Sequence, residues 1–297
     1  MVENITCKDL SVVTPIYNES DGLYLLYDKL RTVLERYSAP WEIIMVNDGS
    51  LDDSATILNE LAAADSRVKV VHFRRNYGQT AAMMAGFNYA TGSIIIAMDA
   101  DLQNDPDDIP QLVAKLEEGY DVCSGWRKNR QDDELRRNLP SRLANRLISW
   151  VSGVNLRDYG CSLKAYKRDV IKDVKLYGEM HRFIPIYASW HGAKVTEIPV
   201  RHHPRKYGKS HYGMERVIKV LLDLIVVKFL DRYAKKPIYI FGGFGLINFL
   251  IGLMAGLWAL FLKFFDGVSF IQTPLPLLVV MTGITGIMCI LMGLLAG

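Results

Sequence analysis

Two aspartates separated by a single residue are the feature of this sequence best suited to chemistry. Asp99 and Asp101 directly follow the apolar run Ile94–Met98. On extended backbone, side chains at alternate positions point the same way, so these carboxylates would repel each other without a cation between them. Mg²⁺ and Mn²⁺ prefer such oxygen ligands and bridge to diphosphate. The spacing therefore predicts a divalent metal site beside a bound phosphate.

Other sites built on paired aspartates fit this sequence less well. An EF-hand starting at Asp99 needs glycine and glutamate where the chain has Asn104 and Pro110. A phosphotransferase of the Asp-x-Asp-x-Thr/Val type would use Asp99 as its nucleophile, but Gln103 replaces the Thr or Val. A trapped phospho-aspartate would revive that alternative. The dinucleotide motif GxGxxG and the P-loop motif are both absent from the sequence.

Polar side chains also follow the first two apolar runs of the chain, in Thr14–Glu19 and Asn47–Ser50. In open α/β sheets, ligands bind beyond the carboxyl ends of the strands. Residues 47–53 alone are better explained by a turn with a helix N-cap at Ser50 or Asp52. Three acidic strand ends on one edge of the same sheet favour a binding site.

The hydrophobic pattern predicts a scaffold that brings these strand ends together. Short apolar runs typical of buried strands alternate with patterns typical of helices. The predicted strands span residues 10–16, 42–46, 68–73 and 93–98, with a further candidate at 121–125, and the predicted helices span residues 22–37, 52–64, 80–90 and 106–118. This alternation predicts an α/β domain with a parallel, doubly wound sheet.

The C-terminal part of the chain predicts a membrane anchor. Of 297 residues 23% are charged, yet residues 238–297 contain only Lys263 and Asp266 as charged side chains. About 20 apolar residues cross the hydrocarbon layer, so residues 238–262 and 274–297 predict a hairpin of two transmembrane helices. A purely soluble protein is excluded. The second helix ends without a flanking charge, so we expect the natural chain to continue beyond it.

Basic residues before the first helix predict the orientation of the chain. Residues 201–236 carry ten basic and three acidic side chains, a balance of +7, whereas residues 1–200 have a balance of −4. The positive-inside rule then predicts a multi-pass protein of the inner or plasma membrane with a cytoplasmic large domain. The basic segment favours anionic headgroups or phosphates over nucleic acid, and a solvated charge run is the alternative.

Residues 213–233 have the pattern of an amphipathic helix that lies on the membrane surface. A core helix of the globular domain is the alternative. Gly252 and Gly256, four positions apart, and the glycines at 242–245 allow close packing of membrane helices. A homo-oligomer formed through these helices is therefore a further expectation.

Taken in order, the motifs resemble family 2 glycosyltransferases of the GT-A fold. The first segments that carry the resemblance are Val13–Glu19, Val46–Ser50, Arg74–Gly78 and Asp99–Gln103. A closer resemblance, to the polyisoprenyl-phosphate hexosyltransferases, rests on the two-helix tail and on Asp105-Pro106, Ser124–Arg127 and Ser141–Asn145. The resemblance covers nearly the whole chain. It implies a GT-A domain over residues 1–211, an interfacial helix region over 212–236 and a transmembrane domain over 237–297.

The resemblance implies a nucleotide-sugar donor, Mg²⁺ or Mn²⁺, and a polyisoprenyl-phosphate lipid as acceptor. Asp99 and Asp101 would flank the metal and the diphosphate, with Asp101 the more direct ligand and Gln103 beside the metal or the sugar. The implied contacts of the donor's base and ribose are Pro15, Tyr17, Glu19 and Asp48. The implied contacts of the donor phosphates are Arg201, Arg205, Lys209 and Ser210.

The implied acceptor-phosphate ligands are Arg127 and Arg142, helped by Arg136 or Arg137. Arginine suits phosphate because its planar fork donates two hydrogen bonds at once. Ordinary surface charge is the alternative for each basic residue.

Asp158 matches the family pattern only in part, because the segment after it reads Tyr-Gly-Cys-Ser-Leu-Lys where the family often has Ser-Gly-Phe-Arg. Its implied catalytic role is contact with the sugar or acceptor, or positioning of the diphosphate. A strong general base is not required, since a lipid phosphate is already anionic near neutral pH.

The segment around Asp158 and the two-helix tail look most like the bacterial glucosyltransferases. This likeness implies inverting transfer of a hexose, glucose from UDP-glucose, to polyprenyl phosphate. Transfer of mannose from GDP-mannose is the first alternative, and transfer of a modified hexose from its UDP-linked donor is the second. A non-catalytic membrane scaffold that binds nucleotide sugars is the alternative of another class, and the aspartate pair with its set of arginines favours the enzyme.

Overall fold

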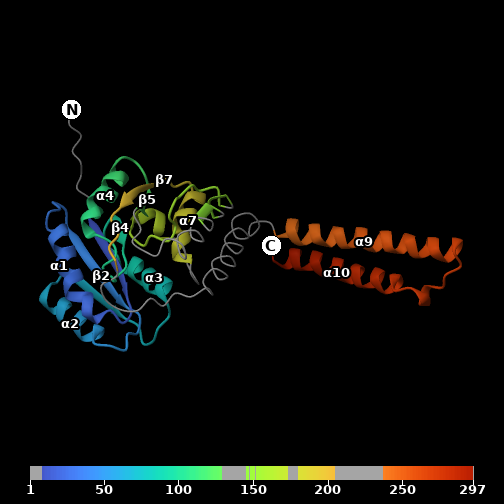
Figure 1. Ribbon diagram of the computed structural model, residues 1–297, viewed down its shortest axis with the longest axis horizontal. Helices are drawn as coiled ribbons and strands as arrows, with labels where there is room; N and C mark the ends of the chain where they lie inside the picture. The colour runs from blue at the N-terminus through green and yellow to red at the C-terminus, as the bar shows by residue number, and fades with distance from the viewer. Residues whose placement is uncertain are drawn as a thin grey trace. The chain divides into compact units, whose positions relative to one another are not determined.

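The computed structural model describes residues 9–128, 145–146, 148–150, 152–172, 180–204 and 237–296. The chain divides into two units, Met1–Leu224 and Ile225–Gly297. The first holds a sheet with helices around it, and the second holds two long helices (Figure 1). The predicted interfacial helix at residues 213–233 lies outside the described residues, so it stays a prediction together with the domain boundaries around it.

The first unit is built on a seven-stranded sheet with strand order β3-β2-β1-β4-β6-β5-β7. The strands are β1 (Leu10–Ile16), β2 (Trp41–Asn47), β3 (Val68–His72), β4 (Ile94–Ala97), β5 (Val122–Arg127), β6 (Lys164–Lys167) and β7 (Val195–Val200). All five predicted strands are present, with ends shifted by at most two residues from the predicted ones. Strands β1 to β4 are parallel, as are β5 and β7.

The sheet is mostly parallel, as predicted, with one exception. β6 runs antiparallel to both of its neighbours, β4 and β5, so the sheet is mixed. β6 reads Lys-Ala-Tyr-Lys, which is too short and too polar to show the apolar run that marked the other strands. Because β6 runs backwards, its first residue, Lys164, lies at the same sheet edge as the carboxyl ends of β4 and β5.

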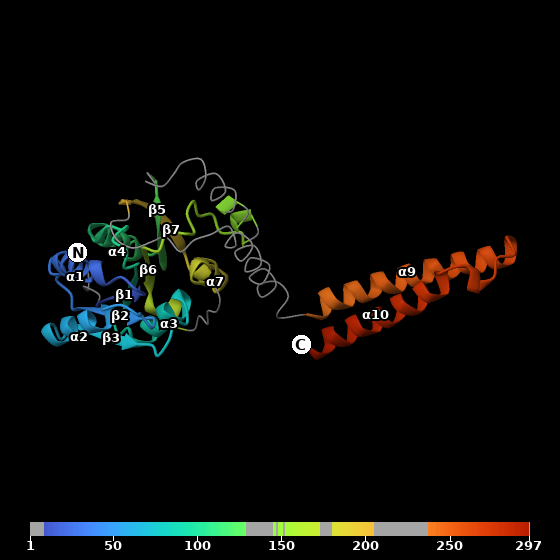
Figure 2. The ribbon, with the colours of Figure 1, turned by 60° about the horizontal axis from the view of Figure 1, so that its bottom comes forward.

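Helices cover both faces of the sheet (Figure 2). They are α1 (Leu23–Leu34), α2 (Ser54–Ala64), α3 (Gln79–Tyr89), α4 (Ile109–Glu117), α6 (Arg168–Ile171) and α7 (Ile184–Trp190), with 3₁₀ turns η1 (Ser20–Gly22), η2 (Pro106–Asp108) and η4 (Met180–Phe183). One core cluster joins the sheet to α1, α2 and α4, and the other joins it to α3, α6 and α7. Burial on both faces explains why these strands read as continuous apolar runs.

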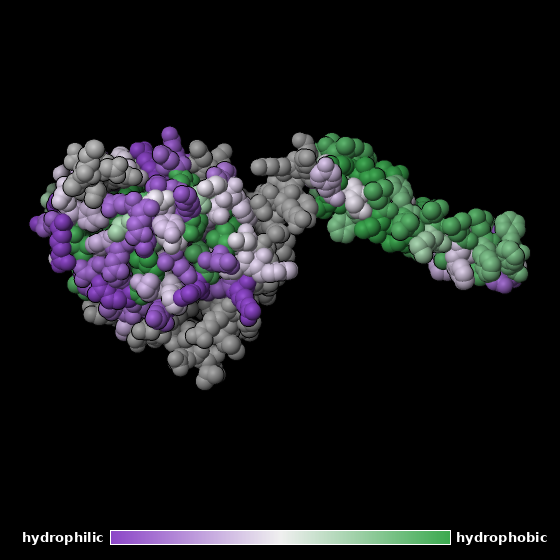
Figure 3. All heavy atoms as spheres, turned by 90° about the horizontal axis from the view of Figure 1, so that it is seen from above, coloured by the Kyte–Doolittle hydropathy of each residue, from purple (hydrophilic) through white to green (hydrophobic). Residues whose placement is uncertain are grey.

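The second unit is a hairpin of α9 (Ile238–Phe265) and α10 (Leu275–Leu295), joined through the 3₁₀ turn η5 (Phe270–Gln272). Both helices are long and apolar enough to cross a membrane. In the most apolar 18-residue stretch of each helix, only 22% (α9) and 17% (α10) is buried. Their outer surface is almost entirely hydrophobic (Figure 3). The predicted helices are confirmed as candidate membrane spans, because such exposed apolar surface suits lipid rather than water.

Small residues line the contact between the two hairpin helices. A Cβ added at Gly245 would lie 2.8 Å from the Gly286 carbonyl oxygen, and one added at Gly252 would lie 2.7 Å from Thr282 Oγ1. Gly243, by contrast, has no such neighbour within 4 Å. Gly245 and Gly252 therefore serve contact within the hairpin. The expectation of an oligomer stays a prediction.

Candidate active site

The loops that follow β1, β2 and β4 meet at one edge of the sheet. Ile16 pairs with Asn47 across β1 and β2, and Val13 pairs with Ala97 across β1 and β4. Parallel pairing therefore brings Tyr17, Asp48 and Asp99, each one or two residues past a strand, to a common edge. This is the edge at which ligands bind in open α/β sheets.

Hydrogen bonds join the loops after β1 and β2. Asn18, at φ 55°, donates its backbone N–H to Ser50 Oγ (3.0 Å), and its side-chain oxygen accepts from Leu51 N (2.8 Å). The backbone N–H of Glu19 donates to Ser54 Oγ (3.3 Å). Pro15, Tyr17 and Glu19 are half-buried at this edge. These predicted contacts of base and ribose thus lie on a loop that hydrogen bonds join to the loop after β2.

The expectation that Ser50 or Asp52 caps the next helix is wrong. α2 begins at Ser54, and Asp53 occupies the N-cap position without a side-chain hydrogen bond. Asp52 instead accepts from Ser20 N (3.0 Å) and Ser54 N (3.1 Å). The polar residues of this turn therefore tie two loops together.

Asp48 is buried beneath the loop that follows β3. Its carboxylate accepts hydrogen bonds from Tyr77 N (2.7 Å) and Gly78 N (2.9 Å). Burial raises the pKa of this carboxyl, and the two backbone hydrogen bonds oppose that rise. Gly49 has φ +67°, and a Cβ there would lie 2.3 Å from the Arg75 carbonyl carbon. Asp48 and Gly49 together hold the residues 75–78 against the β2 loop.

The aspartate pair lies just beyond β4, and both side chains are half-buried. Asp99 Oδ1 accepts a hydrogen bond from Gln79 Nε2 (2.6 Å), and Asp101 Oδ1 accepts from Gln103 N (3.2 Å). Leu102, directly after the pair, has φ 59°, so the backbone turns sharply just past Asp101.

The described residues contain no cluster of three or more His, Cys, Asp or Glu side chains that could hold a metal ion. Two carboxylates at a sheet edge nevertheless suit Mg²⁺ or Mn²⁺, which in phosphate-transferring sites takes its remaining ligands from water and substrate phosphates. Asp99 and Asp101 therefore fit a metal ion that is bound together with a diphosphate.

Arg201, a predicted phosphate ligand, lies against an acidic turn. Its backbone N–H and its Nε donate to the two oxygens of Asp108 (2.7 and 3.1 Å), and Nη1 lies 3.2 Å from Asp105 Oδ2. His203 Nε2 also lies 3.1 Å from Asp105, and its backbone N–H donates to the Gln103 carbonyl (2.8 Å). These bonds join the aspartate loop to the segment after β7.

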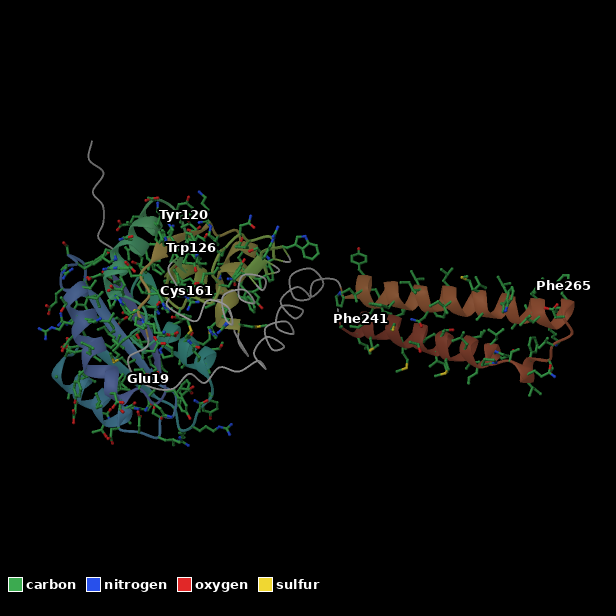
Figure 4. The ribbon with its side chains drawn as sticks, in the orientation of Figure 1. Glu19, Tyr120, Trp126, Cys161, Phe241 and Phe265 are labelled. Carbon is green, nitrogen blue, oxygen red and sulfur yellow. The ribbon has the colours of Figure 1, made fainter. Side chains whose placement is uncertain are left out.

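Arg127 and Asp158 form a buried ion pair. Nε and Nη2 of Arg127 lie 2.7 and 3.0 Å from the two carboxylate oxygens, and the Gly160 N–H donates to Oδ1 (3.1 Å). The two side chains are only 13% and 8% exposed. The loop that carries Asp158 packs against β5: Cys161 Sγ would lie 3.0 Å from a Cβ at Gly125, beside Trp126 (Figure 4). The predicted acceptor ligand is thus paired with the predicted catalytic carboxylate.

Other polar residues at this edge were not predicted. Gln79 and Thr80 begin α3, and Thr80 Oγ1 lies 2.7 Å from Nδ1 of the buried His181. Burial lowers the pKa of His181 well below its usual value, so its ring is neutral near pH 7. Lys164 is buried at the start of β6. The sequence carries one sign that this lysine is buried: it is flanked by the apolar residues Leu163 and Ala165.

The remaining predicted ligands of the donor and acceptor phosphates lie outside the described residues and stay predictions. They are Arg136, Arg137, Arg142, Arg205, Lys209 and Ser210.

The chain matches a family model and is similar to several known proteins. The family model described as glycosyl transferase family 2 matches residues 11–175. Dodecaprenyl-phosphate galacturonate synthase of Rhizobium johnstonii is 41% identical over 97% of this chain and 86% of its own length. Undecaprenyl-phosphate 4-deoxy-4-formamido-L-arabinose transferase of Klebsiella pneumoniae is 42% identical over 86% of this chain and 77% of its own length.

Solved structures show the same fold at low identity. Glucosyl-3-phosphoglycerate synthase from Mycobacterium tuberculosis, in complex with Mn²⁺, uridine diphosphate and glucosyl-3-phosphoglycerate, has a TM-score of 0.56 at 18% identity, with 75% of this chain and 80% of that chain covered. Mannosyl-3-phosphoglycerate synthase from Rubrobacter xylanophilus has a TM-score of 0.57 at 14% identity, covering 75% of this chain and 74% of that chain.

Proposed function

The chain belongs to glycosyl transferase family 2, and we propose that it transfers a sugar from a nucleotide sugar to a polyprenyl phosphate. The observation that carries the proposal is the half-buried pair Asp99 and Asp101 at the sheet edge shared with Asp48. Relatives that match most of the chain are named as polyprenyl-phosphate sugar transferases. The exposed apolar hairpin supports a substrate that resides in the membrane.

The proposed reaction is a single in-line displacement at the anomeric carbon of the sugar. An oxygen of the lipid phosphate forms the new bond to that carbon while the bond to the nucleoside diphosphate breaks, which inverts the configuration. The lipid phosphate is already anionic near neutral pH, so no residue needs to remove a proton first. An α-linked donor therefore gives a β-linked lipid product.

The chain's own residues hold the reacting groups in line. Asp48 and the loop after β1 would bind the base and ribose, and Asp158 with Arg127 would fix the sugar or acceptor. Mg²⁺ or Mn²⁺ bound at Asp99 and Asp101, with Gln103 alongside, would neutralise charge on the leaving diphosphate. Nε and Nη2 of Arg127 contact Asp158, so we propose that Arg127 serves the acceptor phosphate while it stays paired with that carboxylate.

The sequence and the relatives' names point to different sugars. The sequence predicts glucose, but the relatives are named for galacturonate and for 4-deoxy-4-formamido-L-arabinose, which is not a hexose. We therefore retain a UDP-linked sugar as the donor class and place UDP-glucose in a panel with those two sugars and GDP-mannose. We also propose that the first unit faces the cytoplasm, where soluble nucleotide sugars are made.

The test uses the full chain with a radiolabelled nucleotide sugar, Mg²⁺ or Mn²⁺, and polyprenyl phosphate. Label should enter the chloroform phase only with metal, and Asp101→Ala should lower the rate at least about 100-fold. Asp28→Ala, on the exposed face of α1, is the control that should keep the rate. If label stayed in the aqueous phase with every donor while the donors still bound, the chain would be a nucleotide-sugar-binding scaffold instead.

A further inference from the structure

Lys164 occupies a position where a lysine is costly. It begins β6, pairs with Ala97 of β4 and Ser124 of β5, and is only 3% exposed. Transfer of an ammonium group out of water is unfavourable unless a carboxylate or several acceptors compensate it. An apolar side chain would fill this place in the sheet more favourably, so the ammonium group itself needs an explanation.

The ammonium of Lys164 bonds to the turn that carries Asp158. It donates to the carbonyl oxygens of Tyr159 (3.2 Å) and Cys161. The residue between them, Gly160, donates its N–H to Asp158 Oδ1 (3.1 Å). Lys164 therefore bonds to the carbonyl of the same peptide group whose N–H orients the carboxylate, and to a second carbonyl two residues further along the turn. Among the described residues, no carboxylate lies within ion-pair distance of Lys164, so its bonds go to this turn alone.

The position of Lys164 connects this turn to the aspartate pair. Ala97, its partner in β4, precedes Asp99 by two residues, and Ser124, its partner in β5, precedes Arg127 by three. One side chain thus lies between the strand that leads to the aspartate pair and the strand that carries Arg127, the partner of Asp158. A change in the charge of Lys164 would therefore act between the aspartate pair and the Arg127–Asp158 ion pair.

We propose that Lys164 is a positioning residue for sugar transfer, which in its charged form holds the 158–161 turn and thereby the Arg127–Asp158 pair. The inference rests on the proposed function. It adds a role for a residue of β6 at the same sheet edge as the predicted metal ligands.

The charged groups around Lys164 give the proposal a pH dependence. Burial lowers the pKa of Lys164 to about 8; Cys161 and Asp158 from the turn oppose this effect, and Arg182 from η4 and Arg127 from β5 add to it. His181 of η4 is also close enough for Lys164 to lower its pKa. The ammonium therefore loses its proton just above neutral pH, well below the usual lysine value of 10.5.

Activity and stability should then respond to alkali in opposite directions. Loss of the proton removes the strong donor that holds the turn, so transfer should slow as pH rises through about 8. The folded state pays a desolvation cost only while Lys164 is charged. Its folded pKa is depressed, so that cost is full below pH 8 and is relieved as pH rises toward 10.5, and stability should rise over this range. A purely structural lysine would make activity follow stability.

The test compares Lys164→Met and Lys164→Arg with the unmodified chain in the chloroform-extraction assay from pH 6 to pH 9.5. The matched control is Lys167→Met, in the same strand, where the lysine is half-buried and paired with Asp121 (2.7 Å). Lys164→Met should lower kcat at least about 10-fold below pH 8, with donor KM within about threefold. Its pH profile should be flat where the unmodified chain declines, and Lys164→Arg, which does not titrate, should keep activity to pH 9.5.

A Lys164→Met chain that transfers at the unmodified rate, or that keeps the decline above pH 8, would overturn the proposal. If Lys164→Arg does not fold, the pH profile of transfer by Lys164→Met is sufficient to test the proposal. Thermal unfolding separates this failure from failure of the proposed function. A chain that transfers no sugar refutes the transferase, whereas the rise in unfolding midpoint from pH 7 to 9.5, and its loss in Lys164→Met, tests the buried ammonium independently.

Discussion

At the scale of single residues, buried carboxylates join separate segments of the first unit. Asp48 accepts hydrogen bonds from the loop after β3, Asp158 from β5 and its own turn, and Glu42 from β1 and the segment before β4. Each carboxylate has at least one donor from another part of the chain, and hydrogen bonds to a charged acceptor are stronger than neutral ones. Loss of either partner leaves a buried polar group unsatisfied.

Glu42 predicts how the first unit responds to acid. Burial alone would raise the pKa of its carboxyl, but hydrogen bonds from Lys69, Ser11 and Thr91 outweigh burial and lower it to about 2. A depressed carboxyl pKa contributes stability above the unfolded value near 4.5, and this stability is lost as pH falls from 4.5 toward 2. The contribution is on the order of 2 kcal/mol after allowance for solvent around the half-exposed Lys69.

Glu42→Gln should therefore lower the free energy of unfolding at pH 7 and flatten its decline below pH 4.5, as measured by urea titration at several pH values. An unchanged acid profile in this variant would show that other carboxylates set the acid sensitivity. Glu60→Gln is the control, because Glu60 lies on the exposed side of α2.

Asp158→Asn should slow transfer more than it weakens donor binding. The amide keeps the shape and one acceptor but loses the negative charge that pairs with Arg127 (2.7 and 3.0 Å). We expect kcat to fall about 10- to 100-fold and donor KM to change less than about threefold. Asp65→Asn removes another arginine-paired carboxylate, before β3, and should leave kcat unchanged. Unchanged transfer in Asp158→Asn would remove this residue from the catalytic set.

At the scale of elements, the sequence was informative where burial on two faces made a strand apolar. β1 was predicted to the residue, because Leu10–Ile16 is apolar and almost wholly buried. The common edge of Tyr17, Asp48 and Asp99 followed from parallel pairing. β6 could not be predicted, because it begins and ends with lysines rather than apolar residues. Lys164 bonds to the nearby Tyr159 and Cys161 carbonyls, and Lys167 bonds to Asp121, which is 46 residues away in the chain.

Partners that depend on long-range register were likewise unpredictable. Arg201 is 93 residues from Asp108 in the chain, yet the two are joined by two hydrogen bonds. Nothing local to Arg201 distinguishes a carboxylate partner from a phosphate partner, since both accept the same fork of donors. The partner of Arg201 is determined by the fold, which places the end of β7 beside the loop that carries Asp108.

Gly49→Ala should disrupt the contact between the loops after β2 and β3. Its Cβ would lie 2.3 Å from the Arg75 backbone, and φ +67° adds strain. The clash should cost about 2 kcal/mol or more and should weaken donor binding, because Asp48 is next to Gly49. Gly119→Ala is the matched control, with φ +102° and no atom within 4 Å of the added Cβ, so it carries strain without a clash.

Isothermal titration with the nucleoside diphosphate and thermal unfolding measure the two effects of Gly49→Ala. Equal donor affinity in the two glycine variants would contradict a role for the loop contact in donor binding.

At the scale of the whole molecule, the surface of the first unit suits water and the surface of the second suits lipid. The first buries its apolar residues in two clusters on the faces of the sheet. The second exposes most of its large apolar side chains, and its few buried residues are the small ones of the seam. Lipid tails provide no hydrophobic drive for the two helices to meet, so close packing of small residues has to hold them together.

Gly252→Leu should separate α9 from α10. A side chain there would begin 2.7 Å from Thr282 Oγ1, and the seam has no space to receive it. We expect a loss of about 1–3 kcal/mol in hairpin stability, seen as a lower SDS concentration at the unfolding midpoint of the second unit in mixed micelles. Gly243→Leu is the control, since no atom lies within 4 Å of its added Cβ. If both leucine variants unfolded at the same SDS concentration as the unmodified chain, packing at the glycine seam would not be what holds this hairpin closed.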